Sequence, residues 1–189
     1  YEFNSEESKY ALSLLPIEVQ AEIVNDLDPD TRKNFLKVYE PTEITVFVNL
    51  LNSDDAVDIL NELPIKVREE VLVGLDQELR TQVIDLLRYE ENVAGGLMAK
   101  ELIKVRDNWT VVQCIDEIRK QAENVDKFYA VYVVDDRDKL LGRVSLKDLV
   151  VSDARKLVSE MHEEDIVSVE TYMDDIEVAD IMRKYDLES

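Results

Sequence analysis

A serine and an aspartate stand three residues apart in the stretch LLGRVSLKDLV (140–150), and both side chains are of types that take part in catalysis. A serine hydroxyl becomes a nucleophile only when a base takes its proton, and histidine is the usual base. A serine followed by an acid three residues later also caps the start of a helix. Ser145 and Asp148 are therefore candidates for a catalytic pair, a ligand contact or a helix cap, and we favour the cap.

The other reactive residues do not supply a partner for catalysis. The chain has one histidine, His162, in the polar link SEMHEED, and one cysteine, Cys114, in an amphipathic segment. A histidine-assisted triad or a zinc cluster needs more of these residues than the chain contains. No stretch has the glycine and lysine spacing of a phosphate-binding P-loop. We therefore expect a protein that is not an enzyme, with Cys114 in helix packing and no internal disulfide.

Acidic residues are the most prominent feature of the composition. The 189 residues include 43 Asp and Glu against 22 Lys and Arg, a formal net charge of −21. Residues 1–88 carry 19 acids and 8 bases, and residues 89–189 carry 24 acids and 14 bases. Such a surface repels nucleic acid and anionic lipid, and it attracts cations or basic partners. We expect no nucleic-acid partner, and bound divalent cations would relieve the repulsion.

The elements that must hold these residues fall into two parts, each with an internal repeat. Residues 12–32 and 60–80 match at an offset of 48, with Leu-Pro, Glu, Leu-Asp and Arg in common. Apolar residues recur at helical spacing, and Asp28 and Ser53 are helix-start signals. A short helix with one apolar face must stack against neighbours. Residues 1–88 therefore predict an armadillo-like superhelix of helical hairpins, with an unrelated small bundle as the alternative.

A different pattern begins after residues 89–96, which contain a double glycine and form the expected junction. Residues 97–158 read as β-α-β-β-α, with strands at ELIKV, FYAVYVVD and LLGRVSL and a helix at VVQCIDEIRKQ. Residues 159–189 begin the same unit again, since 165–184 align with 101–120 at an offset of 64. The chain ends before this second unit has its strand pair. We expect an α+β protein, and a chain that is part of a longer one.

Together these motifs resemble the cytosolic part of MgtE-type magnesium transporters. The resemblance is carried by the LP…E…LDP repeats, the junction YEENVAGGLM and the strand-turn-strand YVVDDRDKLLGRVSLKDL, and it covers about residues 10–187. It implies an N-terminal superhelical domain, one complete CBS domain and the start of a second. It also implies the cytoplasmic face of the cell membrane, a homodimer formed through the CBS domains, and a transmembrane domain that this chain lacks. In that family Mg²⁺ bridges acidic side chains between domains and subunits and closes the pore.

The resemblance carries metal-ligand positions onto five acidic residues of this chain. They are Glu22, Asp54, Asp58, Asp174 and Asp186. Mg²⁺ takes oxygen ligands and keeps several waters, so one or two carboxylates per ion suffice. Each position also has a structural alternative. Glu22 repeats as Glu70, Asp54 lies in the first turn of its helix, where a carboxylate is stabilised anyway, and Asp174 is a candidate helix cap.

A second ligand is implied by the CBS motif itself. In CBS domains an apolar-x-apolar-Ser/Thr-x-x-Asp pattern binds adenine nucleotides, which makes Ser145, Lys147 and Asp148 candidates to hold the ribose and phosphates of ATP. Ala130 stands where an aromatic side chain would stack on the base, and the net charge disfavours a polyanion. Two other functions stay open. One is an adenine-nucleotide regulatory module, and the other is a helical protein-interaction scaffold, because the repeats also resemble, more weakly, helical domains of flagellar switch proteins.

Overall fold

The computed structural model describes residues 4–121, 125, 128, 130–163 and 165–187. The fold is α+β, as the sequence predicts. The chain divides into two compact units. The first contains Tyr1–Lys100 and Glu170–Ile181, and the second contains Glu101–Val169 and Met182–Ser189.

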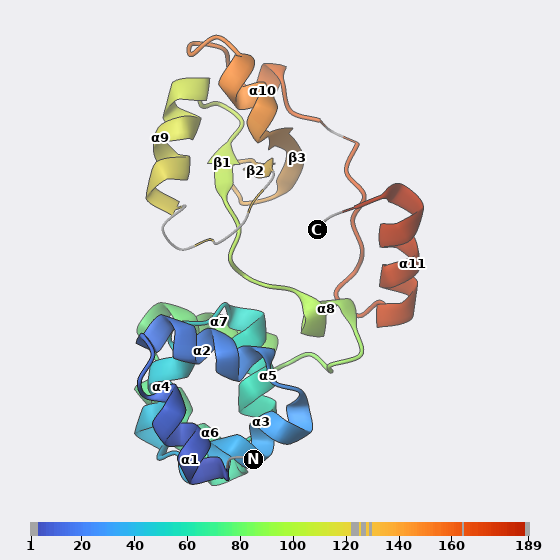
Figure 1. Ribbon diagram of the computed structural model, residues 1–189. Helices are drawn as coiled ribbons and strands as arrows, with labels where there is room; N and C mark the ends of the chain where they lie inside the picture. The colour runs from blue at the N-terminus through green and yellow to red at the C-terminus, as the bar shows by residue number, and fades with distance from the viewer. Residues whose placement is uncertain (1–3, 122–124, 126–127, 129, 164, 188–189) are drawn as a thin grey trace. The chain divides into compact units, whose positions relative to one another are not determined.

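The first unit consists mainly of short helices that stack side by side (Figure 1). In chain order they are α1 (Ser5–Leu12), α2 (Ile17–Asp26), α3 (Pro29–Phe35), the 3₁₀ turn η1 (Leu36–Val38), α4 (Pro41–Val48), α5 (Ser53–Glu62), α6 (Ile65–Gly74), α7 (Gln77–Leu86) and α8 (Ala94–Leu97). Helix α4 packs between α2 and α6, α5 packs against α7, and α1 packs against α3 and η1. The predicted stack of helical hairpins is confirmed.

The helix starts follow local sequence at one predicted cap and depart from it at another. Asp28 is the N-cap of α3, where its side chain accepts the Thr31 N–H at 3.1 Å. The prediction that Ser53 caps α5 is wrong, because Asn52 is the N-cap and Ser53 is the first helical residue. Ser53 is fully buried, and its Oγ accepts the backbone N–H of Lys100 at 2.9 Å.

One apolar core runs through the helical unit, and the 48-residue repeat extends to its polar contacts. Fully buried side chains come from successive helices, among them Val24, Ile44, Val48, Ile59, Leu60, Val71 and Val83. Arg32 donates from Nη1 to the Asn25 carbonyl at 2.7 Å, and Arg80 donates to the Val73 carbonyl at 2.6 Å. Both donor and acceptor recur at an offset of 48. Each arginine thus satisfies a carbonyl near the end of the preceding helix, where the backbone has no partner of its own.

The second unit has the predicted β-α-β-β-α order. Its elements are β1 (Lys104–Arg106), α9 (Val111–Gln121), β2 (Ala130–Val134), β3 (Leu140–Ser145), α10 (Leu146–Val151) and the 3₁₀ turn η3 (Val158–Glu160). The sheet order is β1-β2-β3, with β1 parallel and β3 antiparallel to β2. Tyr129, which the sequence assigns to the middle strand, lies outside the described residues. Cys114 is fully buried in the core under this sheet, as expected for helix packing.

The repeat that starts at residue 159 forms its helix but not its strand. Helix α11 (Asp175–Tyr185) lies where the alignment predicts one, whereas residues 165–170 have no regular structure. No strand forms at 165–170, the segment that aligns with the first strand of the preceding unit, because no described segment pairs with it. Asp186 ends α11 with a left-handed φ of 52°, and the Leu187 N–H returns to the Met182 carbonyl at 3.0 Å. This is the geometry of a Schellman helix stop.

Candidate functional site

Ser145 and Asp148 form a helix cap. Ser145 is the N-cap of α10, and its Oγ accepts the Asp148 N–H at 3.1 Å and donates to Asp148 Oδ2 at 2.6 Å. Gly142, three residues earlier, has no room for a side chain, because a Cβ there would collide with the Glu163 carbonyl and the His162 ring. The serine hydroxyl and the carboxylate are therefore engaged with each other. A nucleotide at this site would have to share these groups with the cap.

The acidic charge of the chain is concentrated in the first unit. That unit holds 26 acidic and 9 basic residues, a net charge of −17, and the second unit holds 17 acidic and 13 basic residues, a net charge of −4. Like charges confined to one compact body repel each other and destabilise it. Cation binding would therefore relieve more charge repulsion in the first unit than in the second.

Asp54 and Asp58 share one face of α5, as their spacing predicts. Asp54 is half-buried and lies in the first turn, and Asp58 is one turn further along and exposed. Although solvent reaches Asp58, partial desolvation of its carboxylate raises its pKa, and the charges of Asp55, Asp54 and Glu91 add to this effect. Arg32 acts in the opposite direction. A bound cation would remove the cost of keeping Asp58 ionised.

Asp174 belongs to the same unit as Asp54 and Asp58. Three backbone hydrogen bonds of 2.7–3.1 Å join residues 92–95 to residues 171–175, and Val93 and Asp174 form an antiparallel bridge between the two segments. Asp174 also precedes α11 and accepts the Ile176 N–H at 3.0 Å, which agrees with a capping role. This contact joins residues 171–175 to the junction segment, which also carries Glu91.

The other two predicted metal ligands stand apart from this group. Glu22 is exposed on α2, and its carboxylate has no hydrogen-bond or ion-pair partner among the described residues. Asp186 is exposed at the end of α11 in the second unit. Within the described part of the chain, no three acidic, histidine or cysteine side chains come close enough to hold one ion. The residues present thus fit ions held by one or two carboxylates and water, the coordination that Mg²⁺ commonly accepts.

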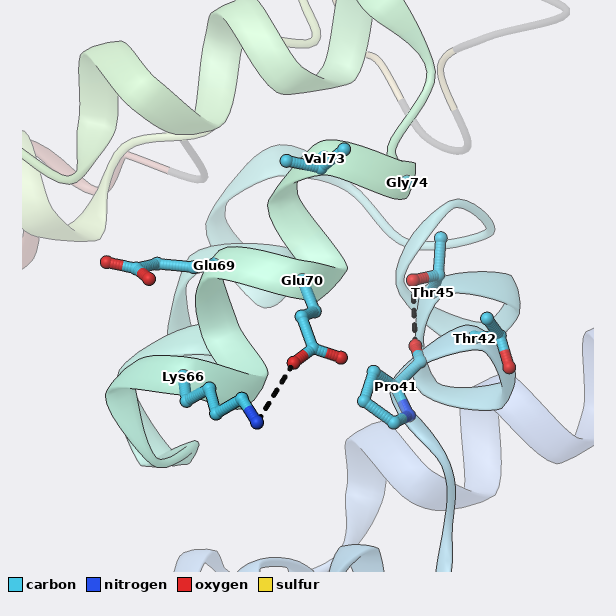
Figure 2. Close-up of a pocket in the computed structure, with 8 residues that line it drawn as sticks. All are labelled: Pro41, Thr42, Thr45, Lys66, Glu69, Glu70, Val73 and Gly74. Atoms are coloured by element: carbon cyan, nitrogen blue, oxygen red, sulfur yellow. Dashed lines mark hydrogen bonds and ion pairs between the residues drawn. The ribbon is translucent and has the colours of Figure 1, made fainter.

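A hollow of about 720 Å³ lies between α4 and α6 of the helical unit (Figure 2). Glu70, the repeat equivalent of Glu22, points from α6 into this space, and the Lys66 ammonium lies 4.0 Å from its carboxylate. The Thr45 hydroxyl on the facing helix donates to the Pro41 carbonyl at 2.8 Å. None of the predicted ligands lines the hollow, whose two carboxylates are Glu69 and Glu70. It is therefore not the candidate metal site.

Two acidic residues that the sequence did not single out, Asp55 and Glu91, lie with the predicted ligands. Both raise the pKa of Asp58 through their charge. Asp55 stands beside Asp54 in the sequence and could have been included on helical spacing alone. Glu91 lies more than 30 residues further along the chain, in the junction, and only the fold brings its charge to α5. We define the acidic band as Asp54, Asp55, Asp58, Glu91 and Asp174.

An acidic helical-repeat unit joined to a CBS-type unit is the class of protein that this fold defines. Family models agree: residues 1–92 match the MgtE intracellular N domain and residues 93–155 match the CBS domain. The solved cytosolic domain of the Mg²⁺ channel MgtE, in complex with ATP, is 34% identical with a TM-score of 0.91, and the match covers 98% of this chain and 76% of that one. The soluble part of a magnesium transporter is 28% identical with a TM-score of 0.87, covering 98% and 73%.

The chain belongs to the MgtE family of magnesium transporters. It is 35% identical over 188 residues to the magnesium transporter MgtE of Thermus thermophilus, a match that covers 98% of this chain and 42% of that protein. The chain therefore spans less than half the length of that relative, and it corresponds to the cytosolic domain of the family with its CBS unit. In the part of the chain that the structure describes, no helix is long and apolar enough to cross a membrane.

Proposed function

We propose that this chain is the Mg²⁺-sensing regulatory region of a magnesium transporter, placed on the cytoplasmic face of the membrane. The observation that carries the proposal is the net charge of −17 on the first unit. Mg²⁺ bound by a compact arrangement offsets the repulsion between carboxylates, and loss of Mg²⁺ lets the carboxylates drive that arrangement apart. The compact arrangement keeps the pore of the full-length transporter closed, and the loosened one releases it.

The acidic band supplies the ligands that this function needs. Asp54, Asp58 and Asp174 are the carboxylates that we assign to Mg²⁺, with Asp55 and Glu91 contributing charge nearby. Glu22 and Asp186 stay candidate ligands for ions that bridge to other parts of the assembly. A Mg²⁺ ion would supply positive charge and ordered water at these positions. Several weak sites that all favour one arrangement shift the population more steeply than one site does.

A homodimer formed through the CBS units is part of the same proposal. Val150 and Val151 on α10 and Val112 on α9 are 79%, 73% and 46% exposed, although all three are apolar. Exposed apolar side chains on neighbouring helices are typical of an interface with another chain. A dimer of this kind would couple the acidic units of two subunits, so that Mg²⁺ acts on both together.

Thermal unfolding in a chelator and in rising MgCl₂, followed by circular dichroism at 222 nm, tests the metal assignment. The wild-type chain should gain stability, by about 1.4 kcal/mol at ten times the dissociation constant. The double variant Asp54→Asn/Asp58→Asn should be more stable in chelator and gain less from Mg²⁺. Glu69→Gln/Glu70→Gln on α6 removes the same charge away from the band and should gain as much as wild type. If both double variants lose the same part of the stabilisation by Mg²⁺, Mg²⁺ acts through net charge alone.

A second ligand, an adenine nucleotide, is favoured by the relative solved in complex with ATP. We assign it to Ser145, Lys147 and Asp148, where the exposed Lys147 would pair with a phosphate. Titration calorimetry with ATP should give a measurable heat with the wild-type chain and a weaker affinity with Lys147→Met. Lys156→Met is the matched control, since it removes one lysine elsewhere in the second unit and should leave the affinity unchanged. No heat with wild type would remove this function.

A further inference from the structure

Lys100, four residues beyond the junction, fixes the chain that leaves the junction to the helical repeats by two separate contacts. Its backbone N–H donates to the buried Ser53 Oγ at 2.9 Å, at the start of α5. Its ammonium lies 2.7 Å from Asp85 Oδ2 on α7. Two residues earlier, Met98 packs against the core of the helical unit. The junction is therefore held by α5, which bears Asp54 and Asp58, and by α7.

The position of this contact in the chain gives it a mechanical consequence. Lys100 is the last residue of the first unit before the chain enters the second, and Ile103, only 1% exposed, is already in the core of the second. While the contact holds, the free backbone at this connection is Glu101 and Leu102. If residues 90–100 detached from the helices, about 13 residues (90–102) would be free. The maximum length of the connecting backbone would then grow from about 7 Å to about 45 Å. The chain also crosses between the units at Val169–Glu170 and Ile181–Met182, so this connection is one of three that limit how far one unit moves from the other.

We propose that Lys100 is a positioning residue for Mg²⁺ sensing, and that its ammonium, paired with Asp85, acts as a built-in cation that favours the compact arrangement without metal. This inference rests on the proposed function. The lysine ammonium pairs with one carboxylate of the acidic unit, as Mg²⁺ would with others, but it is always present. It therefore sets the Mg²⁺ concentration at which the arrangement changes. The ammonium of Lys100 also lowers the pKa of Asp85, which agrees with a formed ion pair.

The same carboxylate offers a matched control. Arg88 Nη1 lies 3.3 Å from Asp85 Oδ1, but both residues are at the end of the same helical segment, and the Arg88 side chain is 71% exposed. Arg88→Met and Lys100→Met each remove one positive charge and one partner of Asp85. Only the second variant detaches the junction from α7. A difference between the two variants therefore reports the attachment and not the charge.

Small-angle scattering of the whole chain across a MgCl₂ titration measures the effect. Lys100→Met should raise the Mg²⁺ midpoint about two- to fivefold, the range expected for a partly exposed ion pair. The Mg²⁺ midpoints of Lys100→Arg and of Arg88→Met should each lie within about twofold of the wild-type midpoint. Equal midpoints for Lys100→Met and Arg88→Met would overturn the inference.

Limited proteolysis separates failure of this inference from failure of the proposed function. Endoproteinase Glu-C cuts after Glu90 and Glu91, both exposed in the junction, and needs the segment to detach. Lys100→Met should be cut there about two to five times faster than wild type or Arg88→Met, with or without Mg²⁺. If Lys100→Met is cut faster but the scattering of the wild-type chain does not change with Mg²⁺, the sensing role is removed and the attachment through Lys100 stands. If Lys100→Met is cut at the wild-type rate, Lys100 does not attach the junction to α7.

Discussion

Replacement of Arg32 by methionine should lower the unfolding free energy of the helical unit by about 3–5 kcal/mol, the cost of stripping one partner from a buried ion pair. The Arg32 side chain is 7% exposed and that of its partner Glu62 is 15% exposed. Nη2 lies 2.5 Å from Glu62 Oε1 and Nε lies 3.0 Å from Oε2, a bidentate pair that joins α3 to α5. Nη1 also serves the Asn25 carbonyl at 2.7 Å. Methionine fills similar space but leaves Glu62 charged, poorly solvated and without a cation.

The repeat supplies the matched control for this variant. Arg80, 48 residues later, donates to the Val73 and Leu75 carbonyls and has no carboxylate partner among the described residues. Arg80→Met should therefore cost only about 1–2 kcal/mol, the loss expected for partly exposed hydrogen bonds. Adding Glu62→Gln to Arg32→Met should recover part of the loss, because the stranded charge is then gone.

Urea unfolding of the whole chain, followed by circular dichroism at 222 nm, measures all three variants. With an m-value of about 2 kcal/mol/M, Arg32→Met should shift the midpoint of the helical transition down by about 1.5–2.5 M. If Arg32→Met and Arg80→Met cost the same, or if Glu62→Gln deepens the loss, the ion pair does not have the role assigned to it.

Three further predictions concern single groups. Asp58→Asn should raise the free energy of unfolding at pH 7 in chelator. The difference from wild type should shrink as the pH falls toward about 4, because the raised pKa of Asp58 means that protonation favours the folded chain. A difference that grows at low pH in urea titrations would contradict this. Burial raises the pKa of the Cys114 thiol to about 11, so Ellman's reagent at pH 8 should label it only in urea, and rapid labelling of the native chain would be the opposite result. Ser145→Ala should cost the second unit about 1 kcal/mol in unfolding followed by Trp109 fluorescence, and no measurable loss would remove the cap.

The parts of the fold that the sequence predicts are those set by local signals. Asp28 before a proline starts α3, and the β-branched run around Val131 and Val133 forms the buried middle strand. Both outcomes depend on residues within a few positions of each other. The 48-residue offset adds a second kind of signal, because Arg32 and Arg80 occupy equivalent places in equivalent hairpins.

Non-local contacts account for what the sequence did not predict. Ser53 has the composition of a cap, but its hydroxyl is buried and serves Lys100, 47 residues away. The segment 165–170 has strand composition but no described neighbour to pair with. Asp186 stands at a helix stop that only its φ of 52° reveals.

The acidic band could be predicted only in part, because some of its residues come together through non-local contacts. Asp54 and Asp58 share a helix face by spacing alone. Glu91 joins them only because the junction folds back toward α5, and Asp174 only because residues 171–175 hydrogen-bond to that junction. Residues that belong to one site but to distant segments carry no spacing signal. They come together only in the fold, so the proposed Mg²⁺ ligands form no sequence motif.

Small-angle scattering of the intact chain in chelator and in rising MgCl₂ tests the central claim most directly. We expect the radius of gyration to fall with Mg²⁺, with a midpoint that rises in Asp54→Asn/Asp58→Asn and not in Glu69→Gln/Glu70→Gln. Potassium chloride of equal ionic strength should not reproduce the change, because screening alone does not bridge carboxylates. Scattering profiles that coincide with and without Mg²⁺ would contradict the account of this chain as a magnesium sensor.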